Sequence, residues 1–167
     1  MKRDFTKLCL TLAMMVFSVF ALAQAPQRKE KESSDEQALA VVNELFDAMR
    51  AKDAEAIRAL FIAEGQLVAT SRRNNQPSIR VFTAEAFAKL ISNQQGVLNE
   101  RMYKPEVRVI GDLAIVSGRY GFYVDDRFSH CGTNAFHLMR TSEGWKIVNA
   151  ASTIEPENCE PESKEKK

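Results

Sequence analysis

The sequence predicts an α+β domain in which helices come first and pack on one face of an antiparallel sheet. Two observations support this class. In the first half of the domain, apolar residues recur at helical intervals behind side chains that can cap helices. From Glu100 onward, apolar residues alternate with polar residues, which is the period of a strand. Helices followed by strands favour a segregated architecture over an alternating one.

Three helices are predicted. The first begins near Ser33 or Ser34, each of which has a Glu or Gln three residues later, in the spacing of a capping box. Its apolar residues recur at helical intervals, at Ala38, Leu39, Val42, Leu45, Phe46 and Met49. Asp53 caps a short second helix, and Thr83 caps the third. We therefore expect the apolar sides of these helices to face the sheet.

The predicted strands lie mostly in the second half of the chain. A short strand at 65–71 precedes an exposed loop at 72–78. The long strands are predicted at 100–111, 112–124, 127–140 and 144–153. Asp125 and Asp126 supply one of the turns. Pro105 suits an edge strand or a strand start, because proline cannot donate a hydrogen bond to a neighbouring strand.

The beginning of the chain is interpreted as a signal peptide at residues 1–25, with a basic start, an apolar run and small residues at the cleavage positions. The run is shorter than the about 20 residues that span a membrane, and an uncleaved anchor is the alternative. A charged linker at 26–34, a domain at 35–154 and a polar tail at 155–167 complete the organisation. We expect an exported protein, periplasmic or extracellular, with no membrane segment after cleavage.

The formal net charge of +1 is close to neutral. A domain with this balance lacks the positive electrostatic footprint of a nucleic-acid-binding protein. We therefore expect no nucleic acid among the partners.

Two cysteines, Cys131 and Cys159, remain after removal of the signal peptide, in a compartment that permits oxidation. A disulfide between them would hold the polar tail across the back of the sheet, and two independent thiols are the alternative. Cys131 alternates to the face opposite His130, so either state leaves the candidate pocket free.

The candidate site lies on the strand at 127–140. Alternation places one set of its residues on a single face: Phe128, His130, Gly132, Asn134, Phe136 and Leu138. This face is apolar except at His130 and Asn134. Two polar groups in an apolar concave wall would orient a small molecule, and they also suit a packed interior if both find partners.

Two aromatic residues extend the candidate site. Tyr120 is predicted to project inward beside His130, either to complete a polar cluster or as a core tyrosine. Trp145 alternates with Ile147 and Asn149 and is either a ligand platform or a core anchor. Glu100, Arg101 and Arg119 are expected in ion pairs that fix strands, and such a pair inside the cavity would instead suggest an acidic ligand.

Metal and cofactor chemistry receives no support from the sequence. His130 and His137 are seven residues apart and fall on opposite faces of a strand, so they cannot share a metal. The chain has no CxxC, HExxH or GxSxG motif, no glycine-rich phosphate loop and no dinucleotide fingerprint. We therefore expect no cofactor and no metal.

The order of these elements resembles the nuclear transport factor 2-like superfamily. The segments at 100–124, SHCGTNAFHL and GWKIVNAAST resemble more narrowly its exported polyketide-cyclase-like and lumazine-binding-like members. The resemblance covers about Asp35 to Cys159. It implies three N-terminal helices packed in the concave face of a strongly bent antiparallel sheet, a cone-shaped α+β barrel that often has a pocket and is often dimeric through the sheet.

The resemblance implies no fixed chemistry, because the superfamily mixes isomerases, cyclases, dehydratases and non-catalytic binders. Ketosteroid isomerase and scytalone dehydratase relatives place aspartate or histidine groups in the cavity. Here Asn134 stands on the corresponding wall, and its amide cannot take a proton. The departure weakens the case for proton abstraction.

Three functional hypotheses follow. The first is a cofactor-free domain that binds a small apolar or aromatic molecule, oriented by Tyr120, His130, Asn134 and Trp145. The second is an isomerase, cyclase or dehydratase that uses His130 as a general base, which would require a carboxylate within about 3.2 Å of His130. The third is a dimerisation module with a filled interior and an apolar outer sheet face.

Overall fold

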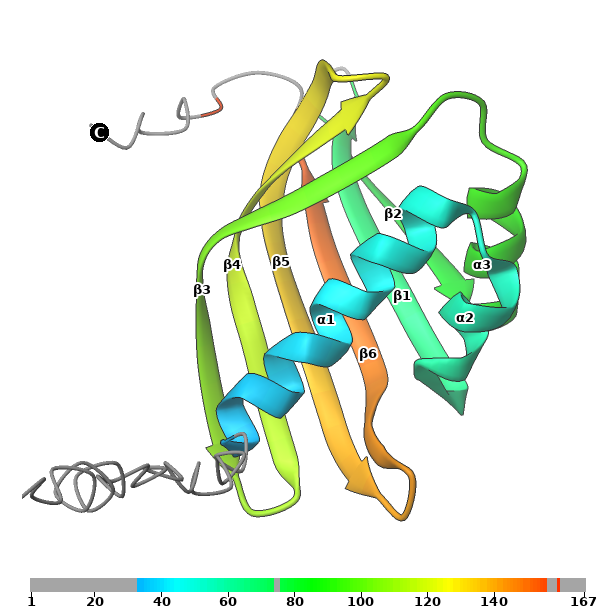
Figure 1. Cartoon of the computed structure of the whole chain (residues 1–167). Helices are drawn as coiled ribbons and strands as arrows, with labels where there is room; N and C mark the ends of the chain where they lie inside the picture. The colour runs from blue at the N-terminus through cyan, green and yellow to red at the C-terminus, as the bar shows by residue number, and fades with distance from the viewer. Residues whose placement is uncertain (1–32, 74–75, 156–158, 160–167) are drawn as a thin grey trace, which may run out of the picture. The chain divides into compact units, whose positions relative to one another are not determined.

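Three helices and six strands make up the part of the chain that the computed structural model describes, residues 33–73, 76–155 and 159 (Figure 1). The predicted signal peptide, most of the linker and most of the tail lie outside these residues. The elements are α1 (Ser34–Ala51), α2 (Ala54–Ala59), β1 (Phe61–Arg73), β2 (Gln76–Thr83), α3 (Ala84–Ser92), β3 (Leu98–Ile110), β4 (Leu113–Val124), β5 (Arg127–Thr141) and β6 (Gly144–Ile154).

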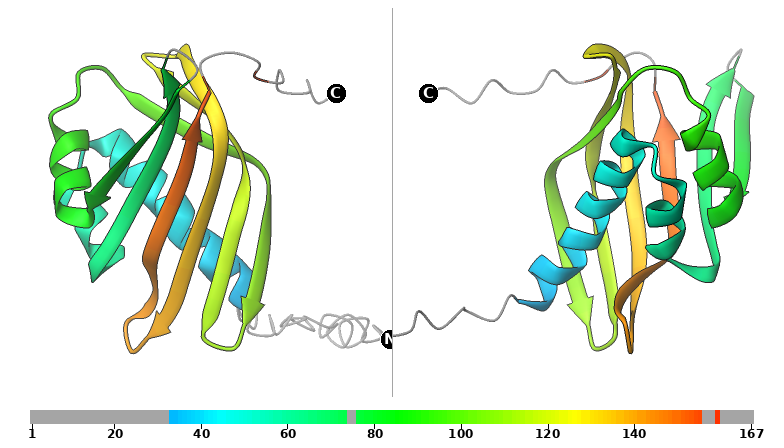
Figure 2. Two further views of the ribbon diagram at one scale, coloured as in Figure 1. Left: turned by 180° about the vertical axis from the view of Figure 1, so that it is seen from behind. Right: turned by 45° about the vertical axis from the view of Figure 1, so that its right-hand side comes forward.

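The strands form one curled sheet in the order β2-β1-β6-β5-β4-β3, with helices on its concave side (Figures 1 and 2). Every neighbouring pair is antiparallel except β1 and β6, which run parallel. The predicted α+β class with N-terminal helices on a bent sheet is confirmed, and the sheet is mixed rather than wholly antiparallel. Pro105 lies on β3, which is an edge strand as predicted.

The helices begin where the sequence predicts. Ser33 caps α1 in a capping box with Glu36, Asp53 caps α2, and Thr83 caps α3. The apolar side of α1 is buried in a core shared with the concave face of the sheet. The large side chains of this shared core that are fully buried include Val42, Leu45, Ile57, Val116, Leu138 and Ile147. Each such side chain contributes about 1.5–3 kcal/mol through the hydrophobic effect. Among the described residues, no helix has the length and apolar character needed to cross a membrane.

The prediction of an exposed loop at 72–78 is wrong in part. β1 continues to Arg73, and Gln76 already begins β2, so the two strands form a hairpin whose last pair is Arg73 with Gln76. β2 itself was not predicted. Its side chains are almost all exposed, including Ile79 and Val81, because it is an edge strand whose residues receive little cover. Ile79 and Val81 alternate with Ser78 and Arg80, but the two apolar side chains face solvent and not the core.

Two irregularities in strand pairing overturn face assignments made from strict alternation. Phe122 pairs with His130 whereas Tyr123 pairs with Phe128, so one extra residue sits in β5. Phe128 therefore lies on the outer face against the Tyr123 ring, at 5.7 Å between ring centroids, and not beside His130. A bulge of this kind moves every residue beyond it to the opposite face.

The second irregularity lies in β6. Leu138 pairs with Ile147 whereas His137 pairs with Asn149. Asn149 therefore shares the face of the exposed His137, opposite Ile147, and the prediction that it alternates with Trp145 and Ile147 on one face is wrong.

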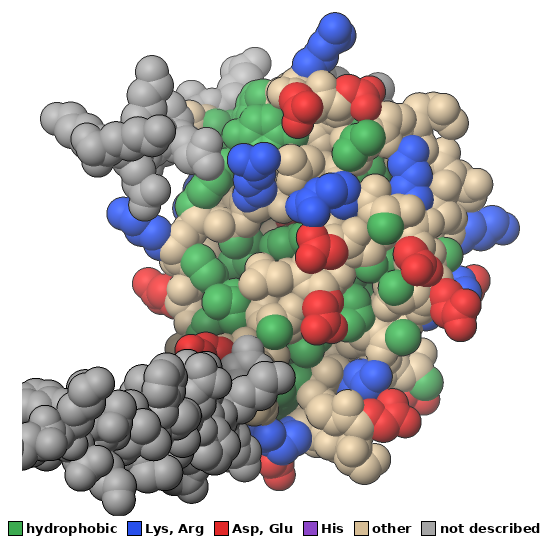
Figure 3. Space-filling model, viewed as in Figure 1, with side chains coloured by type: hydrophobic (Ala, Val, Ile, Leu, Met, Phe, Trp, Pro, Cys, Tyr) green, Lys and Arg blue, Asp and Glu red, His purple; other side chains and the backbone are tan. Residues whose placement is uncertain are grey.

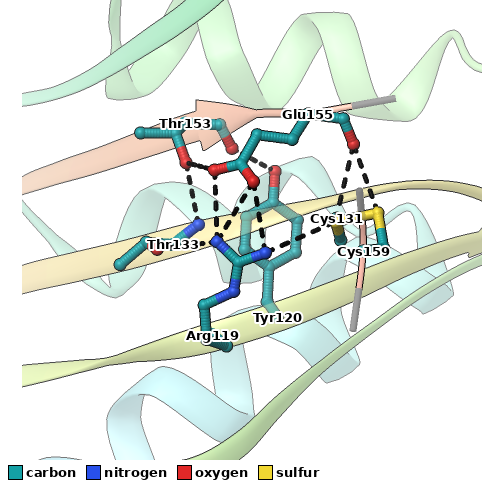
Figure 4. A network of polar contacts seen from close by, with 7 residues as sticks. All are labelled: Arg119, Tyr120, Cys131, Thr133, Thr153, Glu155 and Cys159. Atoms are coloured by element: carbon teal, nitrogen blue, oxygen red, sulfur yellow. Dashed lines mark hydrogen bonds and ion pairs between the residues drawn. A yellow bond between two sulfur atoms is a disulfide. The ribbon is translucent and has the colours of Figure 1, made fainter. Parts of the chain in front are cut away.

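The end of β6 lies very close to β5 at Gly132. The Tyr120 hydroxyl donates to the Thr153 carbonyl at 2.9 Å, and the Thr133 backbone N–H donates to Thr153 Oγ1 at 2.9 Å (Figure 4). A Cβ atom on residue 132 would fall on the Thr153 carbonyl oxygen. Glycine at this position therefore lets the backbone of β6 receive the Tyr120 hydroxyl.

The disulfide between Cys131 and Cys159 is present, with Cα atoms 5.8 Å apart (Figure 4). The backbones of Cys131 and Glu155 exchange hydrogen bonds of 3.0 and 2.8 Å, which extends the pairing beyond β6. The Arg119 guanidinium forms an ion pair with Glu155 at 3.1 Å and lowers the pKa of that carboxyl. The expected ion pair of Arg119 is thus formed on the outer face, with Glu155.

Removal of the disulfide should destabilise the domain. It closes a segment with a sequence separation of 28. A loop of this size corresponds to roughly 2–4 kcal/mol of stability, largely because the bond restricts the unfolded chain. We expect Cys159→Ser to lower the free energy of unfolding by that amount in denaturant titrations. Dithiothreitol should destabilise the unmodified protein equally and leave Cys159→Ser unchanged. Equal stability of the unmodified protein and Cys159→Ser, both measured without dithiothreitol, would contradict the expectation.

Candidate functional site

The concave face of the sheet is apolar with one prominent exception. Asn134 is 1% exposed and is the buried polar side chain among the described residues. It projects inward from β5 between Gly132 and Phe136, as alternation predicts. A buried amide costs free energy unless its donors and acceptor are paired, so its partners decide what this part of the interior can do.

Asn134 is held from both sides. Its Nδ2 donates to Glu100 Oε1 at 2.6 Å, and its Oδ1 accepts from Ser152 Oγ at 2.6 Å. Glu100 comes from β3 and Ser152 from β6, so the amide links three strands across the concave face. We call Glu100, Asn134 and Ser152 the Asn134 bridge. Neither partner of Asn134 was identified from the sequence, because the contacts depend on the curl of β3 over the sheet.

Glu100 is the unusual member of this bridge. Burial raises its pKa to about 7, and the hydrogen bond from Asn134 opposes the rise. Its Oε1 is anchored by Asn134, whereas Oε2 has no hydrogen bond to any residue that the structure describes. The expected ion pair of Glu100 is not formed within this part of the chain. A carboxyl with one oxygen fixed and the other unpaired can accept or donate a hydrogen bond near neutral pH.

Glu100 stands in line with two aromatic side chains. It pairs with Phe122 on β4, which pairs in turn with His130 on β5. Since paired residues project to the same face, Glu100, Phe122 and His130 form a row across three strands, which we call the inner row. The Phe122 and His130 rings are stacked at 4.8 Å with an interplanar angle of 19°. Adjacent strands are about 4.8 Å apart, so the backbones of Glu100 and His130 are about 10 Å apart across the sheet.

His130 lies inward as predicted, but it has a hydroxyl and not a carboxylate as its polar partner. Ser129 Oγ is 3.1 Å from His130 Nδ1, and the Tyr120 ring meets the imidazole edge to face at 5.8 Å. Burial lowers the pKa of His130, which favours the neutral ring. Among the described residues no carboxylate forms an ion pair with it. The geometry required for His130 as a general base is therefore not observed.

The inner row marks the place where the packed interior meets accessible space. Tyr120, Gly132 and Asn134 are buried, whereas all three members of the inner row are partly exposed. Beyond the row, a hollow of about 500 Å³ lies at the turn between β4 and β5. It is lined by Val124, Asp125, Arg127, Phe128 and Ser129. The Oγ of Ser129 lies 3.1 Å from His130 Nδ1, so the hollow lies next to the His130 end of the inner row, whereas Glu100 and Phe122 are not among its lining residues.

The structure brings together three of the four residues predicted to bind a ligand. Tyr120, His130 and Asn134 share the concave face, and the hydroxyl of Tyr120 is already bonded to Thr153. Trp145 lies near the opposite end of the sheet, where it pairs with Arg140. Ten residues of β5 separate Arg140 from His130, about 33 Å along an extended strand. Trp145 is 5% exposed, and the Arg140 guanidinium covers its ring at 4.3 Å.

The charged side chains on the surface do not gather into a patch of one sign on the face shown in Figure 3. Lys and Arg side chains are interspersed with Asp and Glu side chains over the face shown in Figure 3, in line with the near-neutral charge. Within the described ranges, no group of three His, Cys, Asp or Glu side chains is placed to hold a metal ion.

Comparison with family models assigns the chain to a protein family. A model described as putative lumazine-binding matches residues 33–151, which include all the helices and nearly all of the six strands. The chain belongs to this family. Comparison of this lumazine-binding-like domain with curated proteins gives no significant match.

Solved structures described as nuclear transport factor 2-like share the fold of the lumazine-binding-like domain. A nuclear transport factor 2-like superfamily protein from Salmonella enterica has 11% identity over 80% of this chain and 97% of that chain, with a TM-score of 0.59. A nuclear transport factor 2-like protein with a cystatin-like fold from Novosphingobium aromaticivorans has 19% identity over 72% of this chain and 81% of that chain, with a TM-score of 0.57. These similarities show the fold that the resemblance to the nuclear transport factor 2-like superfamily implied.

The raised pKa of Glu100 predicts how stability depends on pH. The folded protein keeps the Glu100 proton up to about pH 7, whereas the unfolded chain releases it near 4.5. The contribution of this bound proton to the free energy of unfolding is complete below pH 4.5 and is lost as the pH rises through 7. In denaturant titrations, the free energy of unfolding should fall by roughly 2–3 kcal/mol between pH 5 and 8, relative to Glu100→Gln.

Glu106→Gln is the matched control, because Glu106 lies exposed on the same strand. It should retain the pH dependence of the unmodified protein. Parallel pH profiles for the unmodified protein and Glu100→Gln would contradict the raised pKa of Glu100.

Proposed function

We propose that this domain binds a small, largely apolar or aromatic molecule at the turn between β4 and β5, in the hollow next to the His130 end of the inner row. The observation that carries the proposal is the inner row itself. It presents an aromatic ring between a carboxyl and an imidazole, all three partly exposed, directly beyond a well-packed core.

The size and lining of the hollow support a small ligand. Ligand sites typically enclose about 300–1,000 Å³ and combine apolar walls with a few polar groups. The hollow of about 500 Å³ has Val124 and Phe128 as apolar lining, with Asp125, Arg127 and Ser129 as polar lining. His130 would orient the ligand through Nε2, because its Nδ1 is already beside Ser129 Oγ.

Tyr120 and Asn134 have a supporting part in this proposal. Tyr120 packs edge to face on His130, and Asn134 fixes Glu100. Both would hold the inner row in position for the ligand rather than supply most of the contact. Trp145 stays outside the proposed site because of its place at the far end of the sheet.

The family assignment supports binding of a small molecule, since the matching model is described as putative lumazine-binding. No cofactor is part of the proposal.

Export to the periplasm or outside the cell remains proposed, and the disulfide is compatible with it. A homodimer through the outer sheet face also remains proposed. Exposed Ile79 and Val81 on that side favour such a contact.

Native mass spectrometry of the protein purified from its own cells tests the binding proposal. We expect a co-purifying small molecule with the unmodified protein and its loss with His130→Ala. His137→Ala is the matched control, because His137 is exposed on the outer face of the same strand. It should retain the molecule. An empty unmodified protein, or equal retention by both variants, would overturn the proposal.

A further inference from the structure

We propose that Glu100 determines the chemistry of the ligand: the site takes a flat aromatic molecule whose N–H or O–H group donates a hydrogen bond to Glu100 Oε2, while its ring lies beside Phe122. This inference rests on the proposed binding function and adds the class of ligand to it. It depends on the geometry of the Asn134 bridge.

The first argument concerns the orientation of Glu100. Asn134 Oδ1 accepts from Ser152 Oγ at 2.6 Å, so the Nδ2 end of the amide is directed to Glu100. An N–H donor fixes one carboxyl oxygen as an acceptor. The carboxyl group thus holds a defined position before any ligand arrives, and this preorganisation lowers the entropy cost of binding.

The second argument concerns the other oxygen. Oε2 has no hydrogen-bond partner among the described residues, yet it is not sealed in the core. Within that part of the chain, the buried side-chain atom without a partner is Trp145 Nε1. Oε2 is therefore not completely enclosed, although the carboxyl as a whole is desolvated and its Oε1 is anchored. An ionised carboxylate is an acceptor only, so its natural partner is a hydrogen-bond donor.

The third argument concerns the neighbours of Glu100. The adjacent member of the inner row is Phe122, and the stacked Phe122 and His130 rings continue the row. Met102 and Tyr120 pair in the next row inward. Aromatic and thioether side chains favour a flat ring through stacking and edge contacts. An aromatic donor matches both the carboxylate and the rings.

Two small probes of the same shape test the inference. Indole carries a ring N–H, and benzofuran has an oxygen that cannot donate at the same place. At pH 8, ¹H–¹⁵N NMR titrations that follow the amides of Phe122 and His130 should give about tenfold tighter binding of indole than of benzofuran, the ratio expected for one hydrogen bond to a charged acceptor.

Glu100→Gln should abolish this ratio. Asn134 would keep the amide oxygen of the new side chain as its acceptor, and the amide NH₂ would replace Oε2, so an acceptor becomes a donor. Glu106→Gln, on the outer face of the same strand, should keep the tenfold preference. Should Glu100→Gln fail to fold, the ratio in the unmodified protein and in Asn134→Ala, which releases Glu100, provides the test. Asn134→Ala should reduce the ratio.

The outcomes separate the two proposals. Equal binding of indole and benzofuran at the inner row would overturn the role of Glu100 and leave the binding function intact. A tenfold ratio that survives in Glu100→Gln would also overturn it. Absence of binding by either probe, together with an empty protein in mass spectrometry, would overturn both.

Discussion

The hydrogen bonds of the Asn134 amide are the constraint on which the candidate site depends. One short bond reaches Glu100 on the edge strand β3, and the other reaches Ser152 on β6. A buried amide needs such partners, and a carboxyl brought inside needs a donor. Each group therefore requires the other, and the pair fixes β3 against the middle of the sheet. The inner row owes its alignment to that fixed strand.

The outer face of the sheet supports this arrangement from behind. The disulfide, the Cys131–Glu155 backbone bonds and the Arg119 ion pair hold the chain just beyond β6 against β5 (Figure 4). The end of β6 itself supplies the Thr153 carbonyl that receives the Tyr120 hydroxyl on the inner side. Gly132 permits this close approach of β6 to β5. Interactions on the two faces thus converge on one short stretch of β5, from Cys131 to Asn134.

Much of the fold could be predicted from the sequence because its signals are local. Caps at Ser33, Asp53 and Thr83 act within one helical turn, and long alternating runs mark β3 to β6. The strand β2 escaped prediction because an edge strand receives little burial. Strict alternation failed where bulges occur, so Phe128 and Asn149 were placed on the wrong faces. Bulges depend on pairing between strands, which a single strand does not encode.

The site was predicted only in part for the same reason. Tyr120, His130 and Asn134 were found because each lies inward on a regular stretch of strand. Glu100 was expected in an ion pair, since its link to Asn134 requires the curl of β3 across the sheet. A charged residue at an inward position of an alternating strand was the available signal.

Direct titration of the Glu100 carboxyl is the most decisive measurement. With ¹³C-labelled glutamate, the Cδ resonance assigned to Glu100 should change with a midpoint near pH 7, because the side chain is held inside the fold. A midpoint near the ordinary value of 4.5 would show a freely hydrated carboxyl and would contradict the account of the site.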